Sequence, residues 1–293
     1  MQYQSPNSKW KRRIISIPIL FLLFNLLLCL WPLFFLVALV ADLVRSRKWP
    51  NVRCLLYIYL FVSCEVIGVI AATWGWFRSR SQEDLIDRTA RLQAWWAGAL
   101  YGGLIRIFSM KLDLQGDESV REGPILIFLR HVSTADTIIP SGLILVPHKI
   151  FLRYVMKQEL LWDPCIDIAG NRLRNLFIHR QSRRRNQNLD GITALASDLT
   201  GQEAILFYPE GTRFTPPKLE RVREKLSENG SDLLRASADR LNHVLPPKLG
   251  GTLTLVRSAP NSDVVFCAHS GLERVTKISN LFNGGLVGID LRV

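Results

Sequence analysis

Hydrophobic positions gather in two long stretches near the N-terminus and in short runs over the rest of the chain. No charged residue occurs from Ile14 to Ala41, and Glu65 is the only one from Leu55 to Phe77. Both stretches reach the roughly 20 apolar residues that a helix needs to cross a bilayer. The pattern therefore predicts two membrane segments followed by a globular part.

The chain is thus expected to have two parts. Residues 1–80 form an N-terminal membrane-anchoring region with hydrophobic segments at about 14–44 and 55–77, and residues 81–293 form the functional domain. The residues up to Val293 look like a strand in progress, without a turn, cap or polar tail. We therefore expect the natural protein to continue beyond this point.

The sequence leaves the topology of the two segments open. Pro18 and Pro32 would bend a helix in the first segment, which is longer than one bilayer crossing and could be partly re-entrant. Loops on the cytoplasmic side of a membrane usually carry an excess of Lys and Arg. Here basic residues stand before, between and after the two segments, so this rule does not assign an orientation. If both ends of the two-segment region are cytoplasmic, the basic loop between the segments lies on the opposite side, which basic loops usually avoid. A shallow hairpin that never fully crosses the membrane would remove this conflict.

Short apolar runs alternate with polar helical stretches in the second part of the chain. This alternation is typical of an α/β fold, and we expect a mixed sheet flanked by helices. The expected strands are Ile125–Leu129, Ile150–Met156, Leu176–Ile178, Ala204–Tyr208 and Val264–Ala268, and the expected helices are Thr134–Leu145, Gln187–Leu199 and Ser231–Leu241. A charged stretch at 216–229 indicates only a solvated loop or helix face.

An amphipathic stretch from Leu92 to Met110 has two interpretations. It carries Trp95, Trp96 and Tyr101, and aromatic rings on an amphipathic helix favour the membrane interface. The stretch could dock the domain against the membrane, or it could be an ordinary helix that faces the core.

The charge of the chain favours lipid as the partner. The formal net charge is +12, which suits anionic headgroups or a polyanionic substrate. The membrane segments favour lipid over nucleic acid, and neither a zinc-finger spacing nor a basic zipper is present. The cysteines show no paired spacing and are interpreted as reduced thiols facing the cytosol; they are Cys29, Cys54, Cys64, Cys165 and Cys267.

The strongest local signal is an H-x-x-x-x-D arrangement at the end of a predicted strand, formed by His131 and Asp136. A neutral imidazole can accept a proton near pH 7, and a carboxylate on its other nitrogen would fix the tautomer and stabilise the imidazolium. In the competing interpretation, Ser133 caps a helix, Asp136 completes a capping box, and His131 is a turn residue. Taken alone, the motif does not decide between them.

A second signal follows another predicted strand, at Tyr208-Pro-Glu-Gly-Thr-Arg213. Glycine lets backbone approach a ligand, and a guanidinium binds phosphate through two parallel hydrogen bonds, so these residue types suit an anion-binding turn. An isolated E-G-T-R string would usually be a plain turn with a surface salt bridge.

Together the two motifs resemble the glycerophospholipid acyltransferase family typified by 1-acylglycerol-3-phosphate acyltransferase. Two weaker blocks, Gly170–Arg180 and Val244–Lys248, stand in the expected order, so the resemblance covers about residues 123–248. Three positions depart from the family pattern. They are Arg130 in place of Asn before the histidine, Tyr208 in place of Phe before the proline, and His179 where the family more often has an acidic or small residue.

The resemblance implies a role for each motif. His131 would be the general base and Asp136 its orienting partner. The acceptor-phosphate site would be formed by Arg180, Glu210, Gly211, Thr212 and Arg213. No metal ligand is assigned. The implied fold is the α/β fold of the glycerol-3-phosphate acyltransferases.

The implied reaction transfers a fatty acyl group from acyl-CoA or acyl carrier protein to the free hydroxyl of 1-acylglycerol-3-phosphate, giving phosphatidic acid. The thioester is a co-substrate, and no cofactor is expected. A thiol leaves readily because its pKa is about 8.5, so the chemistry mainly needs a base for the attacking hydroxyl. No G-x-S-x-G elbow is present and neither Cys165 nor Cys267 has a base nearby in sequence, which favours direct transfer over an acyl-enzyme.

Six arginines between Arg172 and Arg185 form a basic cluster whose role the sequence does not decide. A solvated loop, contact with anionic headgroups, contact with the phosphates of coenzyme A and contact with an acidic carrier protein all fit.

Two other functions remain open from the sequence. The same residues could acylate another lysophospholipid or glycerol 3-phosphate. Alternatively, the chain could be a catalytically silent protein that binds membrane lipids, although the intact pair of His131 and Asp136 argues against this. We expect an N-terminally anchored membrane protein whose domain faces the cytoplasm.

Overall fold

The core of the domain is a five-stranded sheet in a computed structural model that describes residues 6–45, 48–120, 123–179 and 185–293. The strands lie in the order β4-β3-β5-β2-β6. Every residue of β2 is buried, as expected for a nearly continuous apolar run covered on both faces. The strands are β2 (Ile125–Leu129), β3 (Phe151–Lys157), β4 (Leu176–Ile178), β5 (Glu203–Phe207) and β6 (Asp263–Cys267).

The predicted α/β class with a helix-flanked sheet is confirmed, but the pairing is parallel rather than mixed. All four pairings in this sheet are parallel. Each connection between its successive strands contains helical segments, which return the chain to the edge where the previous strand began.

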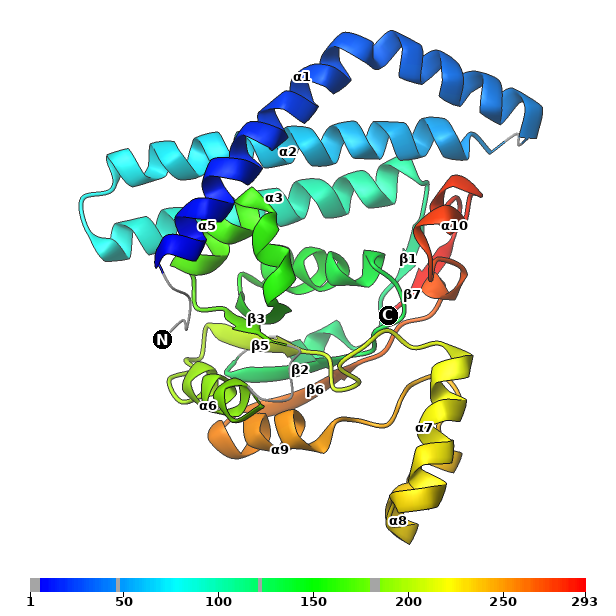
Figure 1. Cartoon of the computed structure of the whole chain (residues 1–293). Helices are drawn as coiled ribbons and strands as arrows, with labels where there is room; N and C mark the ends of the chain where they lie inside the picture. Colours follow the sequence, from blue (N-terminus) through cyan, green and yellow to red (C-terminus); the bar gives the residue numbers. More distant parts are fainter. Residues whose placement is uncertain (1–5, 46–47, 121–122, 180–184) are drawn as a thin grey trace.

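Side chains alternate between the two faces of the sheet. Ile125 and Ile127 pack with the cluster that contains Leu104 of α3. Leu126 and Phe128 point the other way, into the cluster formed with α6 and α9. Figure 1 shows these helices on opposite sides of the strands. They are α3 (Gln82–Ile107), α6 (Arg185–Ala196) and α9 (Leu249–Ser258).

The N-terminal part is a hairpin of two long helices, α1 (Pro6–Arg45) and α2 (Pro50–Arg78). Both are long and apolar enough to cross a membrane, judged by length and composition. α1 contains Pro18 and Pro32 and is bent in Figure 1, as predicted from these two prolines. Asp42 of α1 accepts hydrogen bonds from the backbone N–H groups of Asn51 and Val52, at 3.0 and 2.9 Å. It therefore supplies the N-terminal cap of α2 from outside that helix.

Of the two interpretations of the stretch 92–110, the structure supports the core-facing one. This stretch lies mostly in α3, between the sheet and α2 (Figure 1). Leu100 and Leu104 are almost completely buried. Trp96 donates a hydrogen bond to Glu65, 2.9 Å away, so the one charged residue of the second hydrophobic segment faces protein.

A buried ion pair joins α1 to the domain through α5 (Pro164–Arg172). Asp167 is completely buried and accepts hydrogen bonds from Arg12 at 2.9 Å and from Arg13 at 2.7 Å. Asn171 donates a further hydrogen bond to the same carboxylate. Two of the basic residues before the first hydrophobic segment therefore contact protein.

The helix predicted at Thr134–Leu145 is instead a series of tighter and wider turns. A 3₁₀ turn (Ala135–Thr137) is followed by a π-helix (Ser141–Leu145) and by α4 (Val146–His148). A Cβ on Gly142 would lie 2.1 Å from the ring of Tyr101, so only glycine lets α3 approach here. Tertiary packing thus prevails over the helical pattern.

The remaining elements lie around this core. A second, two-stranded parallel sheet pairs β1 with β7, and α7 and α8 project from the body in Figure 1. These elements are β1 (Lys111–Asp113), α7 (Pro216–Asn229), α8 (Asp232–Asp239), α10 (Ile278–Phe282), β7 (Asp290–Arg292), and 3₁₀ turns at Asp117–Val120, Gln158–Trp162 and Leu272–Arg274.

Candidate active site

Polar residues meet at the carboxyl ends of three adjacent strands, and the predicted ones among them follow β2 and β5. β2 lies between β5 and β6, and all three run in the same direction. His131 follows β2, the turn 208–213 follows β5, and His269 follows β6. Side chains that follow parallel strands converge at one edge of a sheet, which is the usual place for a site in an α/β fold.

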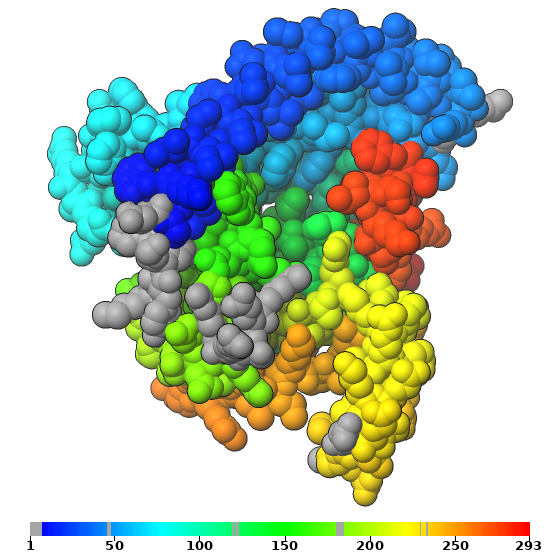
Figure 2. Space-filling model, in the orientation of Figure 1, coloured from blue at the N-terminus to red at the C-terminus, as the bar shows by residue number. Residues whose placement is uncertain are grey.

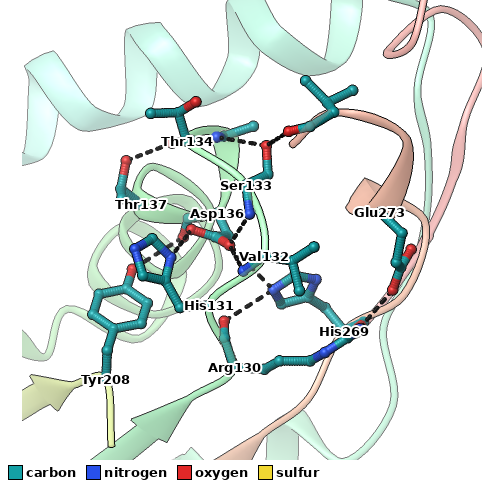
Figure 3. A network of polar contacts seen from close by, with 12 residues as sticks. Arg130, His131, Val132, Ser133, Thr134, Asp136, Thr137, Tyr208, His269 and Glu273 are labelled. Atoms are coloured by element: carbon teal, nitrogen blue, oxygen red, sulfur yellow. Dashed lines mark hydrogen bonds and ion pairs between the residues drawn. The ribbon is translucent and has the colours of Figure 1, made fainter. Parts of the chain in front are cut away.

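His131 and Asp136 form a close pair at this edge (Figure 3). Nδ1 of His131 lies 2.9 Å from Oδ1 of Asp136. The Asp136 side chain is completely buried, whereas 12% of the His131 side chain is exposed. A carboxylate can only accept, so Nδ1 carries the proton and the Nε2 lone pair is left to accept one. The pair predicted from the H-x-x-x-x-D motif is therefore assembled.

The capping interpretation also holds in part, because Asp136 serves two purposes. Its Oδ2 accepts the backbone N–H groups of Val132 and Ser133, at 2.6 and 2.7 Å. The hydroxyl of Ser133 accepts from the N–H of Ala135 and donates to the carbonyl of Val275. One oxygen of Asp136 thus closes the turn while the other holds the imidazole.

Glu210 holds the backbone on which His131 sits. Its two carboxylate oxygens accept the N–H of His131 at 2.9 Å and the N–H of Leu245 at 2.8 Å. The carbonyl of His131 accepts in turn from the N–H of Phe214. Burial raises the pKa of Glu210, and the two amide hydrogen bonds oppose that shift. Both oxygens face protein amides, so the substrate contact expected for Glu210 stays a prediction.

Cationic groups surround the turn that contains Gly211. This glycine has a φ of 64°, and a Cβ there would lie 3.0 Å from the ammonium nitrogen of Lys248. Lys218 donates to the hydroxyl of Thr212 at 3.1 Å and to the carbonyl of Arg213 at 2.7 Å. Within the described ranges, the half-buried guanidinium of Arg213 makes no hydrogen bond or ion pair. The turn thus combines a glycine with three cations, a composition suited to an anion.

The predicted basic cluster at 172–185 is only partly described, and Arg180 lies outside the described residues. Arg172 donates to the carbonyl of Ala72 in α2, and Arg174 forms an ion pair with Asp198. Arg172 therefore contacts α2, whereas Arg174 lies in an ion pair on the surface and remains solvated.

Tyr208 packs against the imidazole of His131, with ring centroids 4.5 Å apart. Burial raises the pKa of Tyr208 well above its usual value, so the phenol stays protonated. Its hydroxyl lies 3.4 Å from the carbonyl of Asp136. This departure from the family pattern adds a polar contact without displacing the pair.

Arg130, the second departure, connects three loops at the site. It donates to the carbonyls of His243 and His269, at 2.9 and 2.5 Å, and forms an ion pair with Glu273. Its guanidinium also lies over the ring of Phe214. The arginine therefore ties the end of β2 to the segments around it.

The motif search missed His269, which lies beside Asp136 in Figure 3. Its side chain is completely buried, with Nε2 3.7 Å from Oδ2 of Asp136 and 3.1 Å from the carbonyl of Arg130. It directly follows the predicted strand Val264–Ala268, just as His131 follows its own strand. Position after a strand was the signal that could have revealed it.

Neither cysteine considered as a nucleophile is activated. Burial raises the pKa of Cys267 to about 11, and burial also raises the pKa of Cys165. Both are therefore thiols near neutral pH. In the described part of the chain, no three His, Cys, Asp or Glu side chains come together in a way that could hold a metal ion.

Known proteins resemble the central part of this chain. The family model described as Acyltransferase matches residues 111–263. A probable 1-acyl-sn-glycerol-3-phosphate acyltransferase 5 of Arabidopsis thaliana is 25% identical over 170 residues, which cover 57% of this chain and 44% of that relative. The match thus spans less than half of the relative's length. The crystal structure of the 1-acyl-sn-glycerophosphate acyltransferase PlsC from Thermotoga maritima aligns with a TM-score of 0.49 and 15% identity, over 82% of this chain and 83% of that one.

Proposed function

Because the chain belongs to the acyltransferase family, we propose that it moves a fatty acyl group from a thioester to the free hydroxyl of 1-acylglycerol-3-phosphate, giving phosphatidic acid. The observation that carries this proposal is the pair of His131 and Asp136, in which Nδ1 is held by a buried carboxylate and Nε2 is left to take a proton. Acyl-CoA or acyl carrier protein is the proposed donor.

The proposed reaction is a direct transfer. Nε2 of His131 takes the proton of the acceptor hydroxyl while the hydroxyl oxygen attacks the thioester carbonyl carbon. Asp136 stabilises the imidazolium that forms. The tetrahedral intermediate then collapses, the carbon–sulfur bond breaks, and the thiolate leaves and takes the proton from His131. No acyl-enzyme is needed, because the thiols of Cys165 and Cys267 stay protonated.

The cationic turn after β5 is the proposed site of the acceptor phosphate. The guanidinium of Arg213 has no partner among the described residues, and the ammonium groups of Lys218 and Lys248 lie close to the same turn. A phosphate there would meet a guanidinium fork and nearby ammonium charges. Arg180 is proposed as a further ligand on the family resemblance alone.

The substitution Arg213→Lys tests this assignment. Lysine keeps the charge but loses the fork, so we expect the KM for 1-acylglycerol-3-phosphate to rise about tenfold with kcat little changed. The KM for the acyl thioester should stay the same. The measurement is a pair of saturation curves, one for each substrate, at matched detergent. Arg240→Lys, an exposed position in the loop after α8, is the matched control. An effect confined to the thioester curve would move Arg213 to the donor site.

We propose that α1 and α2 anchor the protein in a membrane, with the domain on the cytoplasmic side. The outer face of α1 is uncovered along its length in Figure 2, and its exposed side chains are largely apolar. At the end of α2, exposed rings stand at an open hollow of about 610 Å³ lined by three arginines and by Asp84, which pairs with one of them, so that a net positive charge lies beside the rings, as suits the interface of an anionic bilayer. The rings are Trp74, Trp76 and Phe77, and the arginines are Arg78, Arg80 and Arg88.

The proposed function is tested by turnover on a panel of acceptors. The full chain is assayed in detergent with radiolabelled acyl-CoA and acyl carrier protein, against 1-acylglycerol-3-phosphate, lysophosphatidylcholine and glycerol 3-phosphate. We expect the highest kcat/KM with 1-acylglycerol-3-phosphate. A higher value with another acceptor would reassign the substrate, and no turnover on any of them would favour a lipid-binding protein without catalysis.

A further inference from the structure

The peptide group between Arg130 and His131 is held at both polar ends by side chains from different strand ends. Its carbonyl oxygen lies 3.1 Å from Nε2 of His269, which follows β6. Its N–H donates to Glu210, which follows β5. The catalytic imidazole is attached to this peptide group, so its position depends on both contacts. Glu210 belongs to a known motif of the family, whereas His269 lies beyond the residues that the family model matches.

The contacts of His269 define its state. A carbonyl oxygen can only accept, so Nε2 must carry the proton that faces Arg130. Burial lowers the pKa of His269, while the nearby carboxylate of Asp136 opposes that shift. In the described part of the chain, the buried Nδ1 has no hydrogen-bond partner. His269 is therefore neutral at neutral pH, with an N–H dipole that points toward Arg130 and Asp136.

We propose that His269 is a positioning residue for acyl transfer, which holds the peptide group before His131 and the carboxylate of Asp136 through its Nε2–H. The proposal rests on the proposed function of the site. Since the His269 side chain is completely buried, it cannot touch substrate. His269 acts through the Arg130–His131 peptide group and through Asp136. It affects the position of the His131 imidazole and the electrostatic potential at that imidazole.

The electrostatic effect has a definite sign. The Nε2–H dipole lies 3.7 Å from Oδ2 of Asp136 and offsets part of the negative potential that this carboxylate exerts on His131. Without the dipole, the His131 imidazolium is stabilised more strongly, so the acid limb of the kcat profile moves to higher pH. The other groups that face these two rings are Arg130 and Glu273, beside His269, and Tyr208 and Glu210, beside His131.

Two matched substitutions test the proposal. Gln places an amide N–H near the position of Nε2, whereas Asn is chemically alike but reaches only about as far as Nδ1. We expect His269→Gln to keep kcat within about threefold of wild type. His269→Asn should lower kcat by about 10- to 100-fold, with the KM for the lyso-acceptor unchanged, because a base misplaced by a fraction of an ångström loses rate without losing substrate. Only the Asn variant should shift the acid limb upward.

The outcomes separate positioning from packing. If the Asn and Gln variants are equally impaired, with melting temperatures lowered alike and pH profiles unchanged, His269 only fills space and the proposal is wrong. Wild-type kcat and pH profile in a folded Asn variant would also overturn it.

If the His269→Gln and His269→Asn variants both fail to fold, the proposal can still be tested on the wild-type protein. Histidine-selective ¹⁵N NMR of the wild-type protein resolves the tautomer of each of the five histidines. We expect His269 to be neutral and protonated on Nε2 at neutral pH. A proton on Nδ1, or a charged ring at neutral pH, would contradict the proposal. This result does not depend on turnover, so it distinguishes a wrong role for His269 from a wrong function of the site.

Discussion

We expect Asp136→Asn to lower kcat by about three to four orders of magnitude while the protein stays folded. The reason is that Asp136 accepts on both oxygens, from His131 on one and from the amides of Val132 and Ser133 on the other. An asparagine has only one acceptor oxygen. If this oxygen keeps the two amides, the NH₂ group faces Nδ1 of His131 and forces the proton onto Nε2. The base is then in the wrong tautomer and cannot accept the hydroxyl proton.

The measurement is kcat together with the thermal unfolding midpoint for wild type and variant. Asp87→Asn is the matched control, because Asp87 pairs with Arg91 on an exposed face of α3. The control should match wild type in both quantities. An Asp136→Asn protein with near-normal kcat but a clearly lower midpoint would show that the carboxylate only closes the turn.

Asp167→Ala should have the largest effect on stability, about 3–5 kcal/mol. The substitution leaves Arg12 and Arg13, both largely buried, without the carboxylate that they share. Unpaired buried charges are costly because they have given up water without gaining a partner. For a domain of this size, the unfolding midpoint should fall by roughly 6–20 °C. Differential scanning fluorimetry in detergent measures this change.

Two comparisons check the interpretation. Asp87→Ala breaks the exposed pair with Arg91 and should cost under about 1 kcal/mol. A triple variant, Arg12→Gln, Arg13→Gln and Asp167→Asn, removes all three charges and should recover much of the lost stability. If the unfolding midpoint of the Asp167→Ala variant falls no further than that of the Asp87→Ala control, the junction between α1 and α5 contributes little to stability.

The central strands β2 and β5 could be predicted from the sequence because they are covered on both faces. Such strands appear as short, continuous apolar runs, and the predicted bounds of β2 and β4 match the structure. The resemblance to the acyltransferase family, inferred from two motifs at strand ends, is also confirmed. The direction of pairing was not predictable from the runs themselves, since it depends on how each connection crosses the sheet.

The segment after β2 shows where local patterns fail. Its apolar spacing predicted one helix at Thr134–Leu145, but the close approach of Tyr101 at Gly142 and the two roles of Asp136 impose separate turns. The approach of Tyr101 comes from a residue far away in the chain, which a local pattern could not contain, whereas the contacts of Asp136 are with its neighbours in sequence.

The role of a polar residue also depends on distant partners. Glu210 looked like part of an anion-binding turn, yet its contacts in the structure are the amides of His131 and Leu245. His269 carried no motif, because the carboxylate beside it lies 133 positions earlier in the chain. Motifs identified the residues proposed to act on substrate, whereas the residues that contact other residues of the site required the structure.

The junction of α1 with Asp167 also has a consequence for the order of biosynthesis. Asp167 leaves the ribosome 155 positions after Arg12, which at about 5–20 residues per second is a delay of roughly 8–30 s. Until Asp167 has been synthesised, Arg12 and Arg13 thus lack that carboxylate and are two unpaired positive charges before the first hydrophobic segment. After α5 has folded, the same charges are neutralised inside the protein. The junction between α1 and the domain therefore forms only after all of the membrane-anchoring region and more than half of the chain have been synthesised.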